Sequence, residues 1–179
     1  MPRRGKSEKG FSLIELVIVV SVLSILAAIV APQVNKLVLK SKISRLESEL
    51  KTIKTAVNTV YADLGVYPSE VGQNTDPGLL QNSRVPTTYR SNWEGPYLER
   101  WPTSHPWGGT YDYNYGRYSR YNFDSQRGNE VYVTIRNNFT RDILNKIDAD
   151  LDDGNRNAGN IIHNGTSSLT FYVGEGPRW

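Results

Sequence analysis

The sequence contains no cysteine. This absence excludes disulfides, thiolate metal sites, thiol nucleophiles and lipid attachment at cysteine. Histidine is nearly absent too: His105 and His163 lie 58 residues apart and have no flanking ligands, a spacing that disfavours a zinc site or a catalytic triad. The chain has neither a glycine-rich phosphate loop nor a paired catalytic carboxylate motif. We therefore expect no enzymatic activity and no catalytic residues.

The chain also lacks an excess of positive charge outside one short segment. Residues 1–10 hold four basic side chains against Glu8, and 4 − 1 accounts for the whole net charge of +3. The other 169 residues carry 17 basic and 17 acidic side chains and sum to zero. A nucleic-acid partner is therefore not expected, and the tyrosine cluster within 111–121 is better interpreted as sheet packing than as base stacking.

A long apolar run does exist. Residues 11–31 are 21 consecutive residues with one charge, Glu15. A helix of this length spans about 30 Å, which is the thickness of a hydrocarbon core. A secretory signal would have a shorter apolar region of roughly 7–15 residues. The pattern predicts a single membrane-spanning helix, and the hydrophilic bulk that follows is expected outside the cytoplasm.

Glu15 is the unusual residue of this run, because a carboxylate in an apolar helix costs about 2–3 kcal/mol to insert. One interpretation is that its side chain reaches the membrane interface or is protonated there. The other is that it has a cationic partner within the membrane or an assembly. A cut just before Phe11 would create an α-amine four residues upstream, within the same helix or on a neighbouring one.

Residues 9–16, Lys-Gly-Phe-Ser-Leu-Ile-Glu-Leu, resemble the processing signature of type IV prepilins and type II secretion pseudopilins. The resemblance implies that a prepilin peptidase removes the basic leader 1–10 after Gly10 and methylates the Phe11 amine. It also implies that Glu15 pairs with the Phe11 amine of an adjacent subunit during filament growth. Pro32 falls where the family often carries a helix-bending proline.

A helical pattern continues beyond the apolar run. Apolar residues recur every three or four positions over 33–64, which predicts an amphipathic helix that Gly65 ends. Pro32 is expected to kink or open the helix locally. We divide the chain into a leader 1–10, a transmembrane and assembly helix 11–32, an amphipathic helix 33–64 and a globular domain 65–179.

The globular domain begins with a turn-rich stretch over 65–109, after which strand-like alternation starts. The expected strands carry Tyr111, Tyr113 and Tyr115; residues 118–123; Val131, Val133 and Ile135; and Leu169, Phe171 and Val173. The predicted fold class is α+β: a long N-terminal helix packed on a small antiparallel sheet, as in type IV pilins.

The runs Gly95-Pro96-Tyr97-Leu98 and Pro106-Trp107-Gly108 make the chain resemble the major pseudopilins most closely. This resemblance implies a homo-oligomeric helical filament whose partners are prepilin peptidase, the inner-membrane assembly platform and minor pseudopilins or minor pilins. It also implies a single-pass location in a bacterial inner membrane, then in a periplasmic or extracellular filament. The alternatives are a type IV pilin for adhesion, twitching motility or DNA uptake, and an uncleaved membrane-anchored binding domain.

Four aspartates and a glycine form the pattern D-x-D-x-D-D-G over 148–154. Oxygens at alternate positions can surround a hard cation, so Asp148, Asp150 and Asp152 are candidate Ca²⁺ ligands. The spacing of an EF-hand is not met. The competing interpretation is the end of a helix capped by Thr140, with Gly154 or Asn155 as its left-handed stop.

Overall fold

The computed structural model describes residues 10–116 and 129–179. It divides into two compact units, the first ending at Ser41 and the second comprising Lys42–Trp179. One helix, α1, contributes residues to both.

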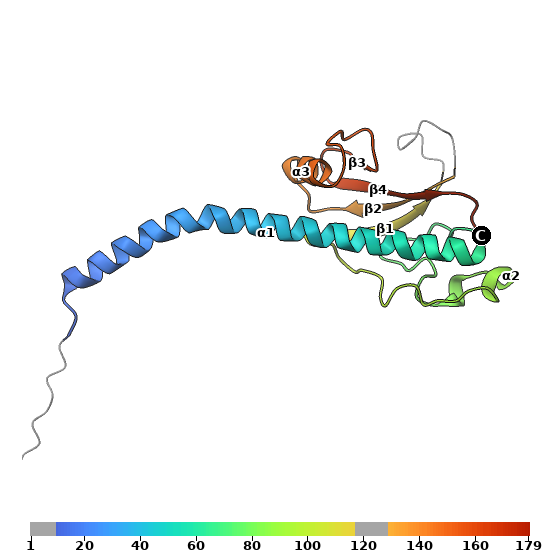
Figure 1. Cartoon of the computed structure of the whole chain (residues 1–179), viewed down its shortest axis with the longest axis horizontal. Helices are drawn as coiled ribbons and strands as arrows, with labels where there is room; N and C mark the ends of the chain where they lie inside the picture. The colour runs from blue at the N-terminus through green and yellow to red at the C-terminus, as the bar shows by residue number, and fades with distance from the viewer. Residues whose placement is uncertain (1–9, 117–128) are drawn as a thin grey trace, which may run out of the picture. The chain divides into compact units, whose positions relative to one another are not determined.

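Helix α1 runs over Leu13–Leu64 as one continuous element (Figure 1). It ends directly before Gly65, which adopts a positive φ of 71° and terminates the helix as the sequence predicts. Pro32 lies inside the helix and removes one backbone donor, but the helical assignment continues through it. The expected local opening at Pro32 therefore does not interrupt the helix.

The sheet of the second unit has four antiparallel strands in the order β1-β2-β4-β3. The strands are β1 Thr110–Tyr115, β2 Glu130–Arg136, β3 Ile161–His163 and β4 Ser168–Glu175. Helix α3, Arg141–Leu151, connects β2 to the β3–β4 pair. The stretch between α1 and β1 holds only two short helices, η1 Asn82–Arg84 and α2 Thr87–Arg90.

The core of the second unit forms where α1 lies along the sheet (Figure 1). Apolar residues at helical spacing on α1 face this core and are buried, from Ile43 through Leu46, Leu50, Ile53, Val57 and Val60 to Leu64. Tyr111 of β1 is fully buried and its hydroxyl donates to the Glu49 carboxylate on the helix. Lys54 reaches across the seam and donates from Nζ to the Tyr172 carbonyl at 3.4 Å.

The observed fold confirms the α+β prediction. The expected alternation at Tyr111, Val131 and Leu169 corresponds to β1, β2 and β4. The strand expected over 118–123 lies outside the described residues. The short strand β3 was not expected, because three residues give too little alternation to detect.

The last residues of the chain pair with the segment that follows α1. Tyr67 donates its N–H to Pro177 O at 2.7 Å, and Trp179 donates its N–H to Tyr67 O at 3.1 Å. The Ser69 hydroxyl donates to the Trp179 carbonyl, and the Arg178 guanidinium lies 4.9 Å from the Tyr115 ring centroid. Residues 177–179 thus hold the start of the turn-rich stretch against the sheet.

Candidate functional site

The N-terminus of α1 contains the charged group that the sequence singles out. The Ser12 N–H donates to Glu15 Oε2 at 2.8 Å, and the Glu15 N–H donates to Ser12 Oγ at 3.2 Å. This reciprocal pair is a capping box, which satisfies two backbone donors at the start of the helix. The Ser-x-x-Glu spacing of residues 12–15 is the signal that could have found it.

The surface around Glu15 is apolar and uncovered. Phe11 is 86% exposed and Leu13 81% exposed, and every large hydrophobic side chain from there to Val38 is exposed as well. This part of α1 is the one described helix that is long and apolar enough to cross a membrane. The hydroxyl groups of Ser21 and Ser24 donate to the carbonyls of Val17 and Val20 on their own helix. The hydroxyl protons of both serines are therefore used within the helix.

These exposed residues need another apolar phase. Burying one large aliphatic side chain is worth about 1.5–3 kcal/mol, so a helix with this surface does not remain dispersed in water. Lipid or the same segment of other subunits can supply the cover. The capped Glu15 then lies at the end of an apolar surface, four residues after Phe11.

The aspartates of residues 148–153, which we call the acidic turn, form a second group of charged side chains. Asp148, Asp152 and Asp153 each offer a carboxylate oxygen, and these oxygens all lie within 4.8 Å of one another. Asp150 is not among them: its carboxylate accepts from Lys146 Nζ at 2.7 and 3.0 Å on the exposed face of α3. The structure therefore brings two of the three expected ligands together and puts Asp153 in the place of Asp150.

The geometry of α3 explains this exchange. The helix extends to Leu151, so Asp148 and Asp152 are four positions apart and share a face, whereas Asp150 points about 200° away from Asp148. Thr140 caps the other end, its Oγ1 accepting from the Ile143 N–H at 3.4 Å. The helix-end interpretation is thus correct, and the carboxylate group coexists with it.

Asp148 is the polar group whose burial is hardest to explain. It is fully buried, and neither carboxylate oxygen has a hydrogen-bond partner in the described part of the chain. His163 Nε2 lies 3.5 Å from Asp148 Oδ2, and the backbone N–H of Gly154 acts on this carboxyl group to lower its pKa. Burial, together with the charges of Asp153 and Asp152, raises the pKa of Asp148 to about 6.

The three carboxylates fit a hard divalent cation. Asp152 Oδ2 accepts from the Ile161 N–H at 2.8 Å and Asp153 Oδ1 accepts from the Asn155 N–H at 2.8 Å, so each retains a second oxygen. Calcium prefers such oxygen ligands, and any two ligands about 2.4 Å from one ion lie at most about 4.8 Å apart. A cation there would also neutralise the buried Asp148 carboxylate.

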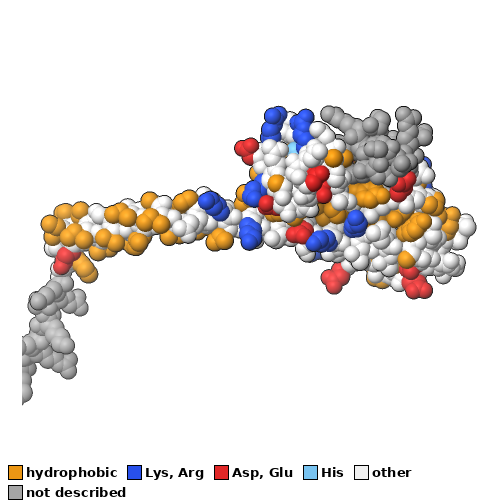
Figure 2. Space-filling view, turned by 45° about the horizontal axis from the view of Figure 1, so that its top comes forward, with side chains coloured by type: hydrophobic (Ala, Val, Ile, Leu, Met, Phe, Trp, Pro, Cys, Tyr) orange, Lys and Arg blue, Asp and Glu red, His pale blue; other side chains and the backbone are white. Residues whose placement is uncertain are grey.

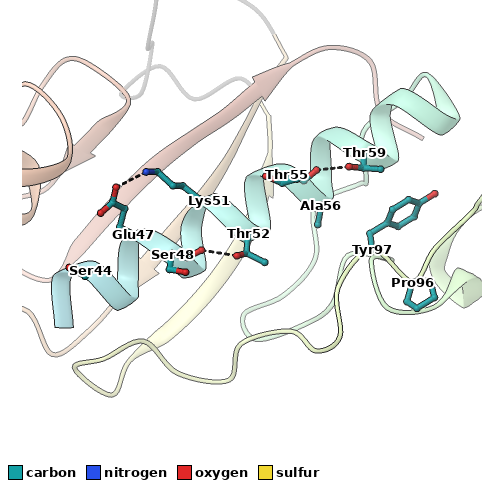
Figure 3. Close-up of a pocket in the computed structure, with 10 residues that line it drawn as sticks. All are labelled: Ser44, Glu47, Ser48, Lys51, Thr52, Thr55, Ala56, Thr59, Pro96 and Tyr97. Carbon is teal, nitrogen blue, oxygen red and sulfur yellow. Dashed lines mark hydrogen bonds and ion pairs between the residues drawn. The ribbon is translucent and has the colours of Figure 1, made fainter. Parts of the chain in front are cut away.

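A groove runs along the exposed side of α1 in the second unit (Figure 3). It encloses about 720 Å³ between the helix and the Pro96–Tyr97 segment. The helix contributes hydroxyl and charged side chains, and Glu47 accepts from Lys51 Nζ at 2.6 Å. Tyr97 donates to Asp63 Oδ2 at 2.7 Å, and burial followed by this bond raises the Tyr97 pKa to about 12.

The residues that line this groove include hydroxyl and charged side chains but no histidine. Its hydroxyls at Thr52 and Thr59 donate to carbonyls one helical turn earlier, so they are not activated by a base. His105 belongs to a turn, in which the Gly108 N–H donates to the His105 carbonyl at 2.7 Å. His105 and His163 lie in separate parts of the described structure and share no polar partner.

Two family models match the chain. The model of the prokaryotic N-terminal methylation motif matches residues 5–31, and that of the PilW C-terminal region matches residues 37–121. Together with the long helix on an antiparallel sheet, these matches define the class: a prokaryotic pilin-like protein with an N-terminal methylation motif. No solved structure matches the chain.

Relatives narrow the class. Type II secretion system core protein G of Pseudomonas aeruginosa is 37% identical over 116 residues, covering 63% of this chain and 76% of the relative. The core protein G of Vibrio cholerae is 31% identical over 113 residues, covering 62% and 73%. The fimbrial protein EcpB of Eikenella corrodens is 42% identical over 77 residues, covering 43% and 46%. The chain belongs to the family of type II secretion system core protein G.

Proposed function

We propose that this chain is a structural subunit of a type II secretion filament. Its leader 1–10 is removed after Gly10, the new Phe11 amine is methylated, and the subunit waits in the inner membrane before it polymerises. The carrying observation is a capped acidic side chain, Glu15, on an otherwise apolar and exposed helix within the methylation motif. Similarity to core protein G supports the choice of secretion system.

In this proposal Glu15 has two successive partners. In the single chain its Oε2 accepts from the Ser12 N–H, which leaves Oε1 open to a second donor. The α-amine of Phe11 on a neighbouring subunit supplies that donor as the filament grows, and the pair sets the axial register of the two helices. A low-dielectric surrounding strengthens such a pair because water no longer competes for either charge.

Three substitutions separate the charge of Glu15 from its capping role. Glu15→Gln keeps an oxygen for the Ser12 N–H but removes the charge, and Glu15→Ala removes both. Ser12→Ala removes the serine half of the box and keeps the charge. We expect both Glu15 variants to insert in the membrane but to give little filament, while Ser12→Ala polymerises. Sheared filament yield measures this, and normal yield from Glu15→Gln contradicts the pairing.

Processing is tested on the same filaments. Mass spectrometry should find a subunit that begins at methylated Phe11. Gly10→Leu should retain the leader without disturbing the fold, because a side chain at Gly10 would contact nothing within 4 Å. Intact Met1 on filament subunits would contradict the proposal and favour an uncleaved membrane-anchored binding domain.

A type IV pilin remains the second candidate. Type IV major fimbrial protein FimA of Dichelobacter nodosus is 46% identical over 56 residues, covering 31% of this chain and 36% of the relative. Electron microscopy of cells that express the chain separates the two functions. Short periplasmic filaments support a secretion subunit, and long surface fibres support a pilin.

We also propose that the acidic turn binds Ca²⁺ through Asp148, Asp152 and Asp153. The support is the proximity of the three carboxylates and the burial of Asp148 without a hydrogen-bond partner. The ion would hold the end of α3 to β3, because Asp152 already accepts from the first residue of that strand. The role is structural, and the proposal assigns no enzymatic activity to the chain.

A further inference from the structure

Helix α1 begins only a few residues after the proposed cleavage site. Gly10, Phe11 and Ser12 lie outside the helix and are exposed, and the helix starts at Leu13. Exposed hydrophobic side chains cover this end of α1 (Figure 2). The apolar run of the sequence already starts at Phe11, so hydrophobicity alone does not put the start of the helix at Leu13.

The capping box accounts for this boundary. A helix that began one turn earlier would bond the Glu15 N–H to the Phe11 carbonyl. In the structure the Glu15 N–H donates instead to Ser12 Oγ at 3.2 Å, and the Ser12 N–H donates to Glu15 Oε2 at 2.8 Å. The Ser12 carbonyl accepts the first backbone bond, from the Leu16 N–H at 3.2 Å. The box therefore competes with an extension of α1 toward the start of the chain.

The peptide bond between Gly10 and Phe11 is left outside the helix as a result. Among the described residues, neither the Gly10 carbonyl nor the Phe11 carbonyl accepts a backbone hydrogen bond. A Cβ at Gly10 would meet nothing within 4 Å, so the space around this residue is open. In a helix extended by one turn, the Ile14 N–H would bond to the Gly10 carbonyl.

Hydrolysis of this peptide bond requires that carbonyl group. The oxygen of water bonds to the Gly10 carbonyl carbon, the C–N bond breaks, and the Phe11 nitrogen takes a proton, which gives a Gly10 carboxyl group and a Phe11 α-amine. Negative charge develops on the carbonyl oxygen in the transition state, and a peptidase stabilises it with donors of its own. A helical bond from the Ile14 N–H would occupy this oxygen, so a helical substrate would first have to unwind.

We propose that Ser12 is a positioning residue for leader removal. As the N-cap of α1, it holds the Gly10–Phe11 peptide in the non-helical conformation that prepilin peptidase cleaves. Ser12 acts through the backbone and does not touch the reacting atoms. The proposal rests on the cleavage after Gly10 that the proposed function includes. Loss of the cap slows cleavage without blocking it, so Ser12→Ala still supplies subunits to the filament.

The test measures the initial rate of leader removal from the full chain in inner-membrane vesicles that contain prepilin peptidase. Three substitutions separate the strength of the cap from the hydroxyl group. Ser12→Thr keeps a hydroxyl, Ser12→Gly has none but is nearly as good an N-cap, and Ser12→Ala is a poor N-cap. Ser21→Ala is the matched control, because its hydroxyl bonds to the Val17 carbonyl farther along the same helix.

We expect Ser12→Ala to lose its leader about fivefold more slowly than the wild type, the factor that the typical cost of replacing a serine N-cap by alanine corresponds to. Ser12→Thr, Ser12→Gly and Ser21→Ala should stay within about twofold of the wild type, since Thr and Gly keep most of the capping free energy. The rates should therefore follow N-cap preference and not the presence of a hydroxyl.

The conformation of the peptide can be measured on the same variants. Gly10-Phe11 is the only Gly-Phe pair in the sequence, so ¹³C-carbonyl glycine combined with ¹⁵N-phenylalanine selects the Gly10 carbonyl in an NMR spectrum. In detergent micelles, the chemical shift of this carbon should move toward the helical value in Ser12→Ala and remain at the wild-type value in Ser12→Gly.

Equal cleavage rates for Ser12→Ala and the wild type would overturn the proposal. Equally slow cleavage of Ser12→Gly and Ser12→Ala would overturn it as well, because the peptidase would then recognise the hydroxyl itself. If the wild-type chain kept its leader, the proposed function would fail first and this inference with it. Rates that differ in the wild-type background but leave the Gly10 carbonyl shift unchanged would also contradict the role of the cap.

Discussion

At the scale of single residues, the turn before β1 shows how closely packed positions determine tolerance to substitution. Gly109 lies where a Cβ would overlap the backbone carbonyl of Arg136 and the His105 ring. The His105 ring is itself fixed, because its Nε2 bonds to that same carbonyl at 3.1 Å. Neither neighbour can move without breaking the pairing of β1 with β2 at Thr110 and Arg136.

Gly109→Ala should therefore destabilise the second unit strongly. We expect a loss of about 3 kcal/mol in the free energy of unfolding, at the upper end of the cost of overpacking. The measurement is urea denaturation of the chain in detergent, followed by tryptophan fluorescence. Gly72→Ala is the matched control, since a Cβ there meets only Thr75 Oγ1 at 3.8 Å. Equal stability of the two variants would contradict this account.

His105 gives a prediction for pH. Its Nδ1 accepts from the Trp107 N–H at 3.3 Å, so the neutral ring carries its proton on Nε2 and donates it to Arg136 O. Burial lowers the His105 pKa below 6.5. The unfolded chain therefore binds a proton at this residue at a higher pH than the folded chain does. The stability that the neutral His105 ring contributes is fully present above about pH 6.5 and is lost as the pH falls below that value.

The melting temperature should accordingly fall from pH 7.5 to pH 5.5 by more in the wild-type chain than in His105→Gln, which cannot titrate. The comparison between the two chains is necessary because Asp148, with its raised pKa, contributes the opposite slope, and His163, with a pKa lowered by burial, adds to the same slope. If the melting temperatures of the two chains changed by the same amount between pH 7.5 and pH 5.5, His105 would be excluded as the cause.

At the scale of elements, the sequence predicted the helices and strands that have enough residues to show a period. The alternation at Tyr111 and Val131 and the helical spacing from Ile43 to Leu64 are examples, since a buried face imposes that period. The capping box at Ser12 and Glu15 was not predicted although its spacing is visible in the sequence, because the charge of Glu15 in an apolar helix pointed to the membrane interface or to a cationic partner.

The carboxylates that cluster in the acidic turn were predicted only in part, and the reason is geometric. The alternate spacing of Asp148, Asp150 and Asp152 suits an extended loop, whereas α3 extends through Leu151 and turns Asp150 to the other side. Asp153 joins the group because the chain leaves the helix there, before the positive φ of 75° at Gly154. Composition alone cannot show where a helix ends, and a cluster at a helix end depends on that boundary.

Calcium removal tests the proposed cation site of the acidic turn at the end of α3. A chelator should lower the melting temperature of the wild-type chain, since a ligand that binds only the folded state stabilises it. Asp153→Asn keeps an oxygen for the Asn155 N–H but weakens the cation site, so the chelator should have little effect on it. Asp150→Asn disturbs only the exposed pair with Lys146 and should respond as the wild type does. An unchanged wild-type melt would remove calcium from the proposal.

At the scale of the whole molecule, the two units differ in which apolar side chains they bury and which they expose. Every buried apolar residue of the described chain lies at or beyond Ile43, so the second unit contains the entire core. The first unit contributes exposed apolar surface and Glu15. Similarity to core protein G and to fimbrial proteins assigns the chain to the pilin-like filament subunits. In the sequence alone, residues 9–16 indicated the same class.

A fragment of residues 40–179 should therefore fold alone. We expect a monomer in sedimentation experiments and a single cooperative urea transition with the midpoint of the full chain in detergent. The physical reason is that removal of residues 1–39 deletes no buried side chain among the described residues. A fragment that binds hydrophobic dyes and unfolds without a transition would show that the core needs the first unit.

The continuity of α1 has a mechanical consequence. Helix α1 is continuous from Leu13 to Leu64, with one backbone donor missing at Pro32, so tension on the apolar segment is carried into the second unit along a helical backbone. There the load acts in shear on the seam that includes Leu46, Leu50 and Ile53, and many contacts resist it together. A flexible coil would lengthen before it transmitted force, whereas a helix lengthens only when its backbone hydrogen bonds break.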